Sequence, residues 1–231
     1  FMSMKRVLLA LVAAVVICGC GKDDMGEYYP TIGNKELHYI SRSGEKVPFE
    51  DDDFDVPVIS NSYDNGRGIV RFASPLKRIY FLGSLDITSI TIPLSVTDFE
   101  GNPFKSCRNL ARFISEYATS DGYALVKDNS FIALARNYMG DSYNISYGVK
   151  YIGSSAFLGS KIKSITLPNS ISEIGDYAFA ECEELEALIF PERLQSLGMG
   201  VCVNCTNPRE VSLPQSLSIE NNFGCFVGCE N

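Results

Sequence analysis

The sequence contains no tryptophan and only one histidine, His38, among its 231 residues. A single histidine leaves few routes to nucleophile–histidine catalysis or to a metal site built on imidazole ligands. Basic residues are also in the minority, since 20 lysines and arginines face 28 aspartates and glutamates, for a net charge of −8. An acidic surface repels nucleic acid. We therefore predict a chain without catalytic activity, cofactor or nucleic-acid partner.

Long hydrophobic runs are scarce as well. The apolar run at residues 7–17 has 11 residues and follows two basic ones, at positions 5–6. A helix needs about 20 residues to cross a bilayer, so this run fits the core of a signal peptide. It ends in the sequence ICGC, which resembles the lipobox of bacterial lipoproteins. The resemblance implies cleavage after Gly19 and a lipid on Cys20; the alternative is an ordinary secretory peptide with incidental cysteines.

The residues that follow Cys20 contain a second localisation signal. Lys22, Asp23 and Asp24 resemble the surface-export signal of Bacteroidetes lipoproteins, which implies an outer-membrane protein that faces the cell exterior. The alternative is a plain solvated tether, which we place at residues 20–35. Loss of residues 1–19 would remove two basic residues and no acid, so the net charge would change from −8 to −10.

Internal repeats indicate the fold. Residues 164–168 (SITLP), 187–191 (ALIFP) and 210–214 (EVSLP) recur at a spacing of 23, and 89–93 (SITIP) and 142–146 (SYNIS) are earlier copies. Apolar residues alternate in each copy, which predicts short strands with one buried face. Proline ends a strand because it cannot donate to the ladder of hydrogen bonds.

A second module follows each strand. Residues 171–175 (ISEIG) predict a strand and a turn, and residues 178–182 (AFAEC) close the coil with a phenylalanine in the core. One such coil cannot bury its apolar side alone, whereas a stack of coils can. The fold predicted is a mainly β solenoid of about 23-residue coils with short helical or 3-10 turns.

The combined pattern resembles the BspA-like leucine-rich repeats of bacterial surface lipoproteins, over about residues 69–231. Residues 36–68 are expected to form a small β module, with a hairpin turn at Asn65 and Gly66. The resemblance implies a cell-surface binding or adhesion module for a protein ligand, with host extracellular-matrix proteins among the candidates. The alternative function is that of a structural accessory lipoprotein in an envelope complex.

One stretch of the repeat region is too long for the pattern. Ser146 follows Pro93 at a spacing of 53, more than two coils of 23 require, which predicts an insertion at about 115–141 with a hairpin near 127–130. Insertions in solenoids often bind partners. The alternative is that its tyrosines pack the hairpin onto the solenoid. The candidate ligand contacts are Tyr117, Tyr123, Arg136 and Tyr138.

Two groups of residues suggest metal sites. Paired cysteines at residues 202–205 and 225–229 resemble a zinc-ribbon spacing. Repeat register explains them as buried residues of successive coils, because cysteine behaves there as a small hydrophobe. The acidic residues 50–53 with Asp55 could bind calcium, but no loop pattern fixes the ligand geometry. We favour packing cysteines and a solvated acidic loop, and expect no metal.

Overall fold

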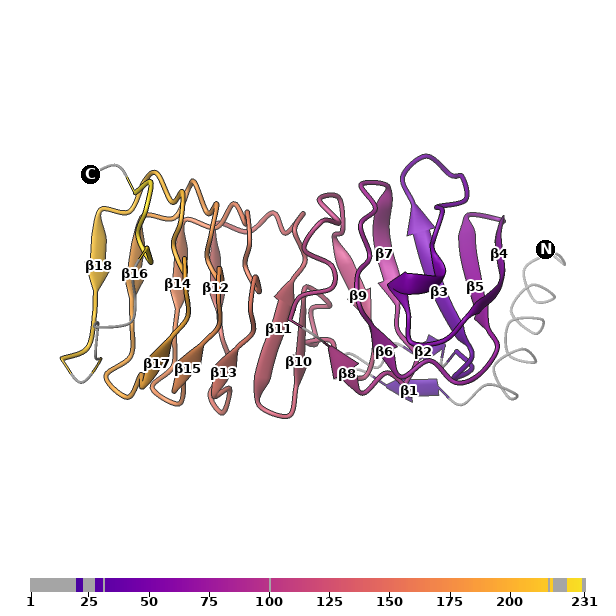
Figure 1. The fold of residues 1–231 in the computed structure, drawn as a ribbon, viewed down its shortest axis with the longest axis horizontal. Coiled ribbons are helices and arrows are strands. Elements are labelled where there is room, and N and C mark those ends of the chain that lie inside the picture. The colour runs from indigo at the N-terminus through magenta and orange to yellow at the C-terminus, as the bar shows by residue number, and fades with distance from the viewer. Residues whose placement is uncertain are drawn as a thin grey trace, which may run out of the picture.

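The computed structural model describes residues 20–22, 28–30, 32–99, 101–215, 217 and 224–229. Figure 1 shows an elongated molecule in which short strands lie side by side along the long axis. Within the described ranges the one helix is the 3-10 helix η1 (Asp51–Asp53). No helix in that part of the chain is long and apolar enough to cross a membrane. The prediction of a mainly β solenoid is confirmed.

The N-terminal β module is a five-stranded sheet that continues into the first coils. Its strands, in spatial order, are β4 (Val58–Asp64), β5 (Arg67–Phe72), β3 (Glu36–Ser41), β7 (Ile87–Thr91) and β9 (Arg112–Ile114). The expected hairpin joins β4 and β5, and Asn65 and Gly66 in its turn both have positive φ. β7 and β9 pair in parallel, which begins the solenoid.

The expected boundary of this module at residue 68 falls inside β5. Ile69 and Val70 pair antiparallel with β3 on one side and with β4 on the other, in the register already set before residue 68. The antiparallel pairing thus continues past residue 68, with a bulge between Val58 and Ser60, and residues 69–72 lie in the sheet of the module.

The segment expected to be a tether, residues 20–35, contains two short strands. β1 (Cys20–Lys22) and β2 (Tyr28–Pro30) pair antiparallel, with Cys20 opposite Pro30. The expected signal peptide, residues 1–19, lies outside the described residues, and so do Asp23 and Asp24 of the expected export signal.

The later coils stack their strands in parallel in two sheets (Figure 1). The first sheet contains β12 (Ser142–Asn144), β14 (Ser164–Thr166), β16 (Ala187–Ile189) and β18 (Glu210–Ser212). The second starts with the antiparallel hairpin of β10 (Ala124–Lys127) and β11 (Ser130–Leu134) and continues with β13 (Tyr151–Ile152), β15 (Glu173–Ile174) and β17 (Ser196–Leu197). In the earlier coils, β6 (Arg78–Ile79) and β8 (Asp98–Phe99) form a separate parallel pair.

The segments that close the coils are hydrogen-bonded turns, and the helical or 3-10 turns expected there are absent from the described coils. The physical reason is that two residues of each later coil have a left-handed backbone, which a right-handed helix cannot continue. One of these positions precedes the alanine of the AFxxC pattern and the other follows its phenylalanine by two residues. Four coils have them at Ser155 and Gly159, Tyr177 and Glu181, Gly200 and Asn204, and Gly224 and Gly228.

Most side chains predicted to face inward are buried. Phe157 and Phe179 stack in the core with ring centroids 5.1 Å apart. Val211 departs from the prediction, because 39% of its surface is exposed. It lies on β18, the last strand of its sheet in the described part of the chain. The buried inward residues are Ile90, Ile92, Tyr143, Ile145, Leu188 and Phe190, while Ile165, Leu167 and Leu213 are partly buried against the same cores.

The predicted insertion lies between two hydrophobic cores. The hairpin of β10 and β11 is the edge of the second sheet, and β11 pairs in parallel with β13 of the next coil. Leu125 and Ile132 are buried in the N-terminal core, whereas Phe131 and Leu134 are buried in the C-terminal core. The hairpin therefore joins the two halves of the molecule and is built into the stack.

Candidate binding surface

The predicted tyrosines pack onto the solenoid. The rings of Tyr123 and Tyr138 meet edge to face with centroids 5.0 Å apart, and the hydroxyl of Tyr138 donates to the carbonyl of Ser142 at 2.8 Å. Tyr138 also meets Tyr143 at 5.5 Å. Burial raises the pKa of Tyr143 to about 12. Because Tyr123 packs on Tyr138, only 37% of the surface of Tyr123 is exposed.

Tyr117 lies in a different environment from this pair. Its ring meets Phe99 at 6.1 Å and the amine of Lys127 at 5.7 Å, and its hydroxyl donates to the carbonyl of Leu94 at 3.3 Å. The structure thus brings together Tyr123 and Tyr138, but places Tyr117 against the preceding coil. These contacts are the packing that was considered as the alternative role for these tyrosines; a role in ligand contact stays a prediction.

Arg136 joins three coils through backbone carbonyls. Its Nη1 donates to the carbonyl of Lys105 at 2.8 Å and its Nη2 to that of Gly159 at 3.5 Å. The side chain is half-buried and has no carboxylate within 4.0 Å among the described residues. Burial, followed by the charge of Arg108, lowers the pKa of Arg136. A desolvated guanidinium without an acidic partner is a marked feature of this region.

Arg136 lines an open groove of about 630 Å³ that crosses the coils. We call it the coil-edge groove; it extends from Gly83 in the first coil to Asn204 five coils later. Cations line one part of it, where Lys105 and Arg108 accompany Arg136. The walls further along contain Leu158, Tyr177, Glu181 and Val203.

The groove is built from one repeated element of the sequence. The two residues between the phenylalanine and the cysteine of AFxxC contribute Leu158 in one coil, Glu181 in the next and Val203 and Asn204 in the one after. The repeat pattern marks these positions only as spacers, so the sequence did not predict the groove. The residue types at these positions could have indicated the groove, because a position that only spaces the core residues does not require a cation such as Arg136 or Lys105.

Tyr177 is an aromatic residue of the groove with a left-handed backbone. Its φ is +55°, a left-handed backbone that costs a non-glycine residue roughly 1–2 kcal/mol. The side chain is 45% exposed and extends over the next coil, where a Cβ at Gly200 would lie 2.5 Å from its ring. The backbone is held there by the amide of Tyr177, which donates to the carbonyl of Met199 at 2.9 Å. Glu181, at φ +57°, is the second strained residue of the same coil.

The repeat geometry matches a known family. The model of the BspA-type leucine-rich repeat region matches residues 74–132 and 136–231, in six copies. This chain belongs to that family.

Solved structures of bacterial leucine-rich repeat proteins have a related fold. A leucine-rich cell surface protein of Faecalibacterium prausnitzii A2-165 is 22% identical, with a TM-score of 0.51 over 64% of this chain and 47% of that protein. A leucine-rich repeat protein of Eubacterium ventriosum ATCC 27560 is 21% identical, with a TM-score of 0.49 over 62% of this chain and 41% of that protein. This chain thus spans less than half of either relative. Curated proteins give no match.

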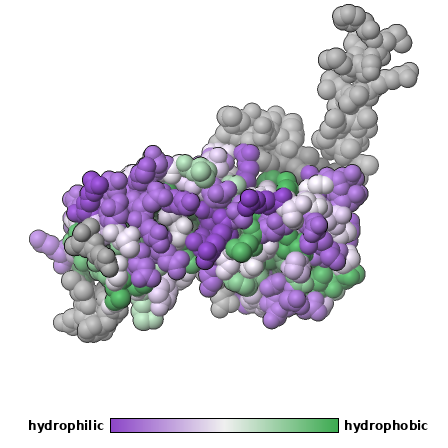
Figure 2. Space-filling view, turned by 90° about the horizontal axis from the view of Figure 1, so that it is seen from above, coloured by the Kyte–Doolittle hydropathy of each residue, from purple (hydrophilic) through white to green (hydrophobic). Residues whose placement is uncertain are grey.

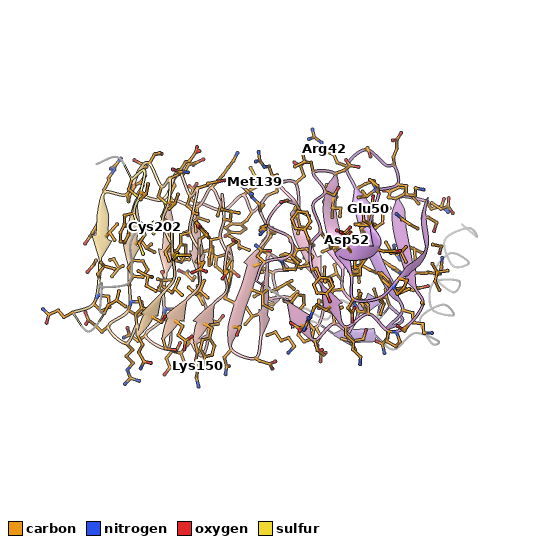
Figure 3. All side chains as sticks on the ribbon, viewed as in Figure 1. Arg42, Glu50, Asp52, Met139, Lys150 and Cys202 are labelled. Atoms are coloured by element: carbon orange, nitrogen blue, oxygen red, sulfur yellow. The ribbon has the colours of Figure 1, made fainter. Side chains whose placement is uncertain are left out.

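The cysteines of the BspA-type coils form a ladder of thiol hydrogen bonds. The Sγ of Cys182 donates to the carbonyl of Phe157 one coil earlier at 3.1 Å, and the Sγ of Cys205 donates to that of Phe179 at 3.0 Å. Cys107 and Cys229 repeat the contact, at 2.7 Å and 3.0 Å, in their own coils. Figure 3 shows Cys202 inside the stack.

The same cysteines do not gather around a common point. All six in the described ranges are free, and no group of three or more histidine, cysteine, aspartate or glutamate side chains there could hold a metal ion. Burial raises the pKa of Cys107 to about 11 and also raises that of Cys182. The thiols of Cys107 and Cys182 are therefore protonated at neutral pH and pack as small apolar groups, whereas a hydrogen bond with the thiol of Cys202 lowers the pKa of Cys205.

The acidic loop and the histidine of the β module have structural partners. Asp51 accepts a hydrogen bond from the amide of Val58 at 3.0 Å, and Asp55 accepts one from the amide of Arg78 at 3.0 Å. His38 contacts the carboxylate of Glu36 at 3.0 Å, and burial lowers its pKa. The carboxylates thus fix the loop on neighbouring backbone.

Proposed function

We propose that this protein is a lipid-anchored binding protein of the outer membrane that faces the cell exterior and holds a protein ligand without catalysis. The observation that carries the proposal is the stack of BspA-type coils with an open groove along its edge. Solenoids of this kind use extended surfaces for recognition. The proposed anchor is Cys20, and host extracellular-matrix proteins are among the candidate ligands.

The chemistry of the described side chains supports a binding role over a catalytic one. The histidine is paired with Glu36, and burial keeps Cys107 and Cys182 protonated. A nucleophile is activated by an adjacent base, a lowered pKa or a metal, whereas the pKa values of Cys107 and Cys182 are raised. Binding requires only a complementary surface, which the groove offers.

Capture from intact cells tests the proposal. Cells that carry the protein should adhere to surfaces coated with host matrix proteins or with proteins of neighbouring cells. Cells that lack the gene should not adhere. An affinity-tagged protein that instead recovers only envelope proteins of its own cell would indicate the accessory role and contradict the proposed one.

A further inference from the structure

The cations of the coil-edge groove form no close ion pair among the described residues, although Glu181 attracts Arg136 from a longer distance. Lys105 and Arg108 are exposed, Arg136 is half-buried, and none of the three forms an ion pair within the part of the chain that the structure describes. The whole chain has a net charge of −8. Three unpaired positive charges at one place therefore create a local field opposite in sign to that of the rest of the protein, which attracts an anionic group.

Arg136 is already held in place for such a group. Two backbone carbonyls, of Lys105 and Gly159, fix its guanidinium between coils. A guanidinium has five N–H donors, so donors remain for an incoming carboxylate. Because the group is half-buried and its side-chain entropy is already lost, a charge-assisted hydrogen bond to it costs less ordering than one to a free surface arginine.

The neighbouring wall of the groove has a different character. Tyr177 presents an exposed ring in a strained backbone, and Leu158 lines the groove beside the cations. Tyrosine is enriched among residues that dominate binding energy. Glu181 lies on this wall too, so the positive field does not extend along the whole groove.

The dimensions favour an extended chain. Adjacent parallel strands lie roughly 4.8 Å apart, so the six coils from Gly83 to Asn204 span roughly 24 Å, the length of about seven extended residues. Figure 2 shows hydrophilic residues over most of the face seen there, with apolar residues in separate smaller areas. The groove itself is lined by cations and a few apolar side chains, so a short charged segment fits it better than a broad apolar interface does.

We propose that the coil-edge groove binds an extended acidic peptide segment of a protein partner. Carboxylates of that segment face Lys105, Arg108 and Arg136, and an apolar side chain of it packs on Tyr177. The proposal rests on the role of the chain as a protein-binding module and names the chemistry of its partner. A uniformly charged polyanion such as a sulfated polysaccharide fits less well, because Glu181 interrupts the cations along the groove and a sugar sulfate has no apolar side chain to pack on Leu158 and Tyr177.

Fluorescence polarisation with purified protein tests this. The probe is a labelled peptide of about ten residues with two aspartates followed by leucines, and its control replaces the aspartates by lysines. The acidic peptide should bind and the basic one should not. Replacement of two exposed cations, Lys105→Gln with Arg108→Gln, should weaken binding at least tenfold, or about 1.4 kcal/mol. Added salt should weaken it as well, because the contacts are ionic.

A matched control removes a cation elsewhere. Lys150 lies at the lower edge in Figure 3, whereas Met139, three residues after Arg136, lies at the upper edge. Lys150 does not line the groove, so Lys150→Gln should leave the affinity within twofold. Tyr177→Gly removes the ring and relieves the left-handed strain. It should weaken peptide binding at least threefold without lowering the melting temperature to the same degree.

Three results would overturn the inference. The first is that the wild-type protein does not bind the acidic peptide at about 1 mM, a concentration that still detects a weak complex. The second is equal binding by wild type and the Lys105→Gln, Arg108→Gln variant. The third is preferential binding of a sulfated oligosaccharide. The cell assay separates this inference from the proposed function. Cells with the double variant that keep full capture would refute the groove as the site and leave the proposed function intact.

Discussion

The guanidinium of Arg136 lies directly over the α-carbon of Gly159 in the next coil. A Cβ at position 159 would collide with Nη2 of Arg136, and Gly159 has a φ of +61°. The glycine therefore serves two purposes at once: it supplies the left-handed turn that closes its coil, and it makes room for the arginine that the previous coil extends across it.

Gly159→Ala should accordingly lower the free energy of unfolding. The left-handed backbone alone costs an alanine about 1–2 kcal/mol, and the displaced guanidinium adds to this. The double variant with Arg136→Ala should recover the steric part but not the backbone part, which a double-mutant cycle by urea denaturation measures. A Gly159→Ala protein as stable as wild type would contradict the geometry of this contact.

The closing cysteines should tolerate serine better than valine. Ser160 occupies the closing position of its coil and is only 4% exposed, so a hydroxyl is accepted there. Cys182→Ser keeps a donor for the carbonyl of Phe157 and should cost about 1 kcal/mol, whereas Cys182→Val has no donor and overpacks the site, at about 1–3 kcal/mol. Chemical denaturation of both variants decides the order. A more stable valine variant would mean that only apolar packing matters at this position.

Burial of the thiols makes the stability depend on pH in a defined direction. The pKa of Cys107 rises from 9.0 to about 11 in the folded protein, so above pH 9 the unfolded chain loses protons that the folded chain keeps. The stabilisation is therefore complete below pH 9 and is lost as the pH rises towards 11. Urea unfolding at pH 8 and pH 10, compared with a Cys107→Ser variant, isolates this effect from the titration of lysines and tyrosines. An equal loss in both proteins would contradict it.

The repeat register is the part of the fold that the sequence predicts best. Strand positions such as Ile145 and Leu188 follow from period-two alternation and a fixed spacing, and both are buried as expected. The left-handed residues were not predicted, because Tyr177 and Glu181 do not resemble the glycines that occupy the equivalent positions in other coils. The preference of these residues for negative φ is overridden there, because each coil must turn tightly to stack on its neighbours.

The groove could not be predicted for a related reason. Its residues come from six coils and lie far apart in the sequence, so only the stacking of coils brings Lys105, Arg136 and Glu181 onto one surface. The expected hairpin of the insertion corresponds to β10 and β11, but its side chains alternate between two cores, and no sequence period identifies which core each one enters.

The proposed lipid anchor and surface location are tested by substitutions near the N-terminus. Cys20→Ala should abolish labelling by a palmitate analogue and leave unprocessed precursor, since no thiol remains to take the lipid. Replacement of Lys22, Asp23 and Asp24 by alanine should protect the lipidated protein from protease added to intact cells, with a periplasmic protein and a known surface protein as controls. Native protein that resists the protease would contradict an outward orientation.

The hairpin that joins the two cores should be more important for stability than for ligand contact. Leu125 is fully buried in the N-terminal core, and its truncation to alanine should cost about 2–5 kcal/mol. Tyr123, two residues earlier, is 37% exposed, and Tyr123→Ala should cost far less stability because only its edge-to-face contact with Tyr138 is lost. Thermal unfolding of the two variants makes the comparison. If Leu125→Ala unfolds at the temperature of wild type, the hairpin is an appendage after all, and the tyrosines return as the leading candidates for ligand contact.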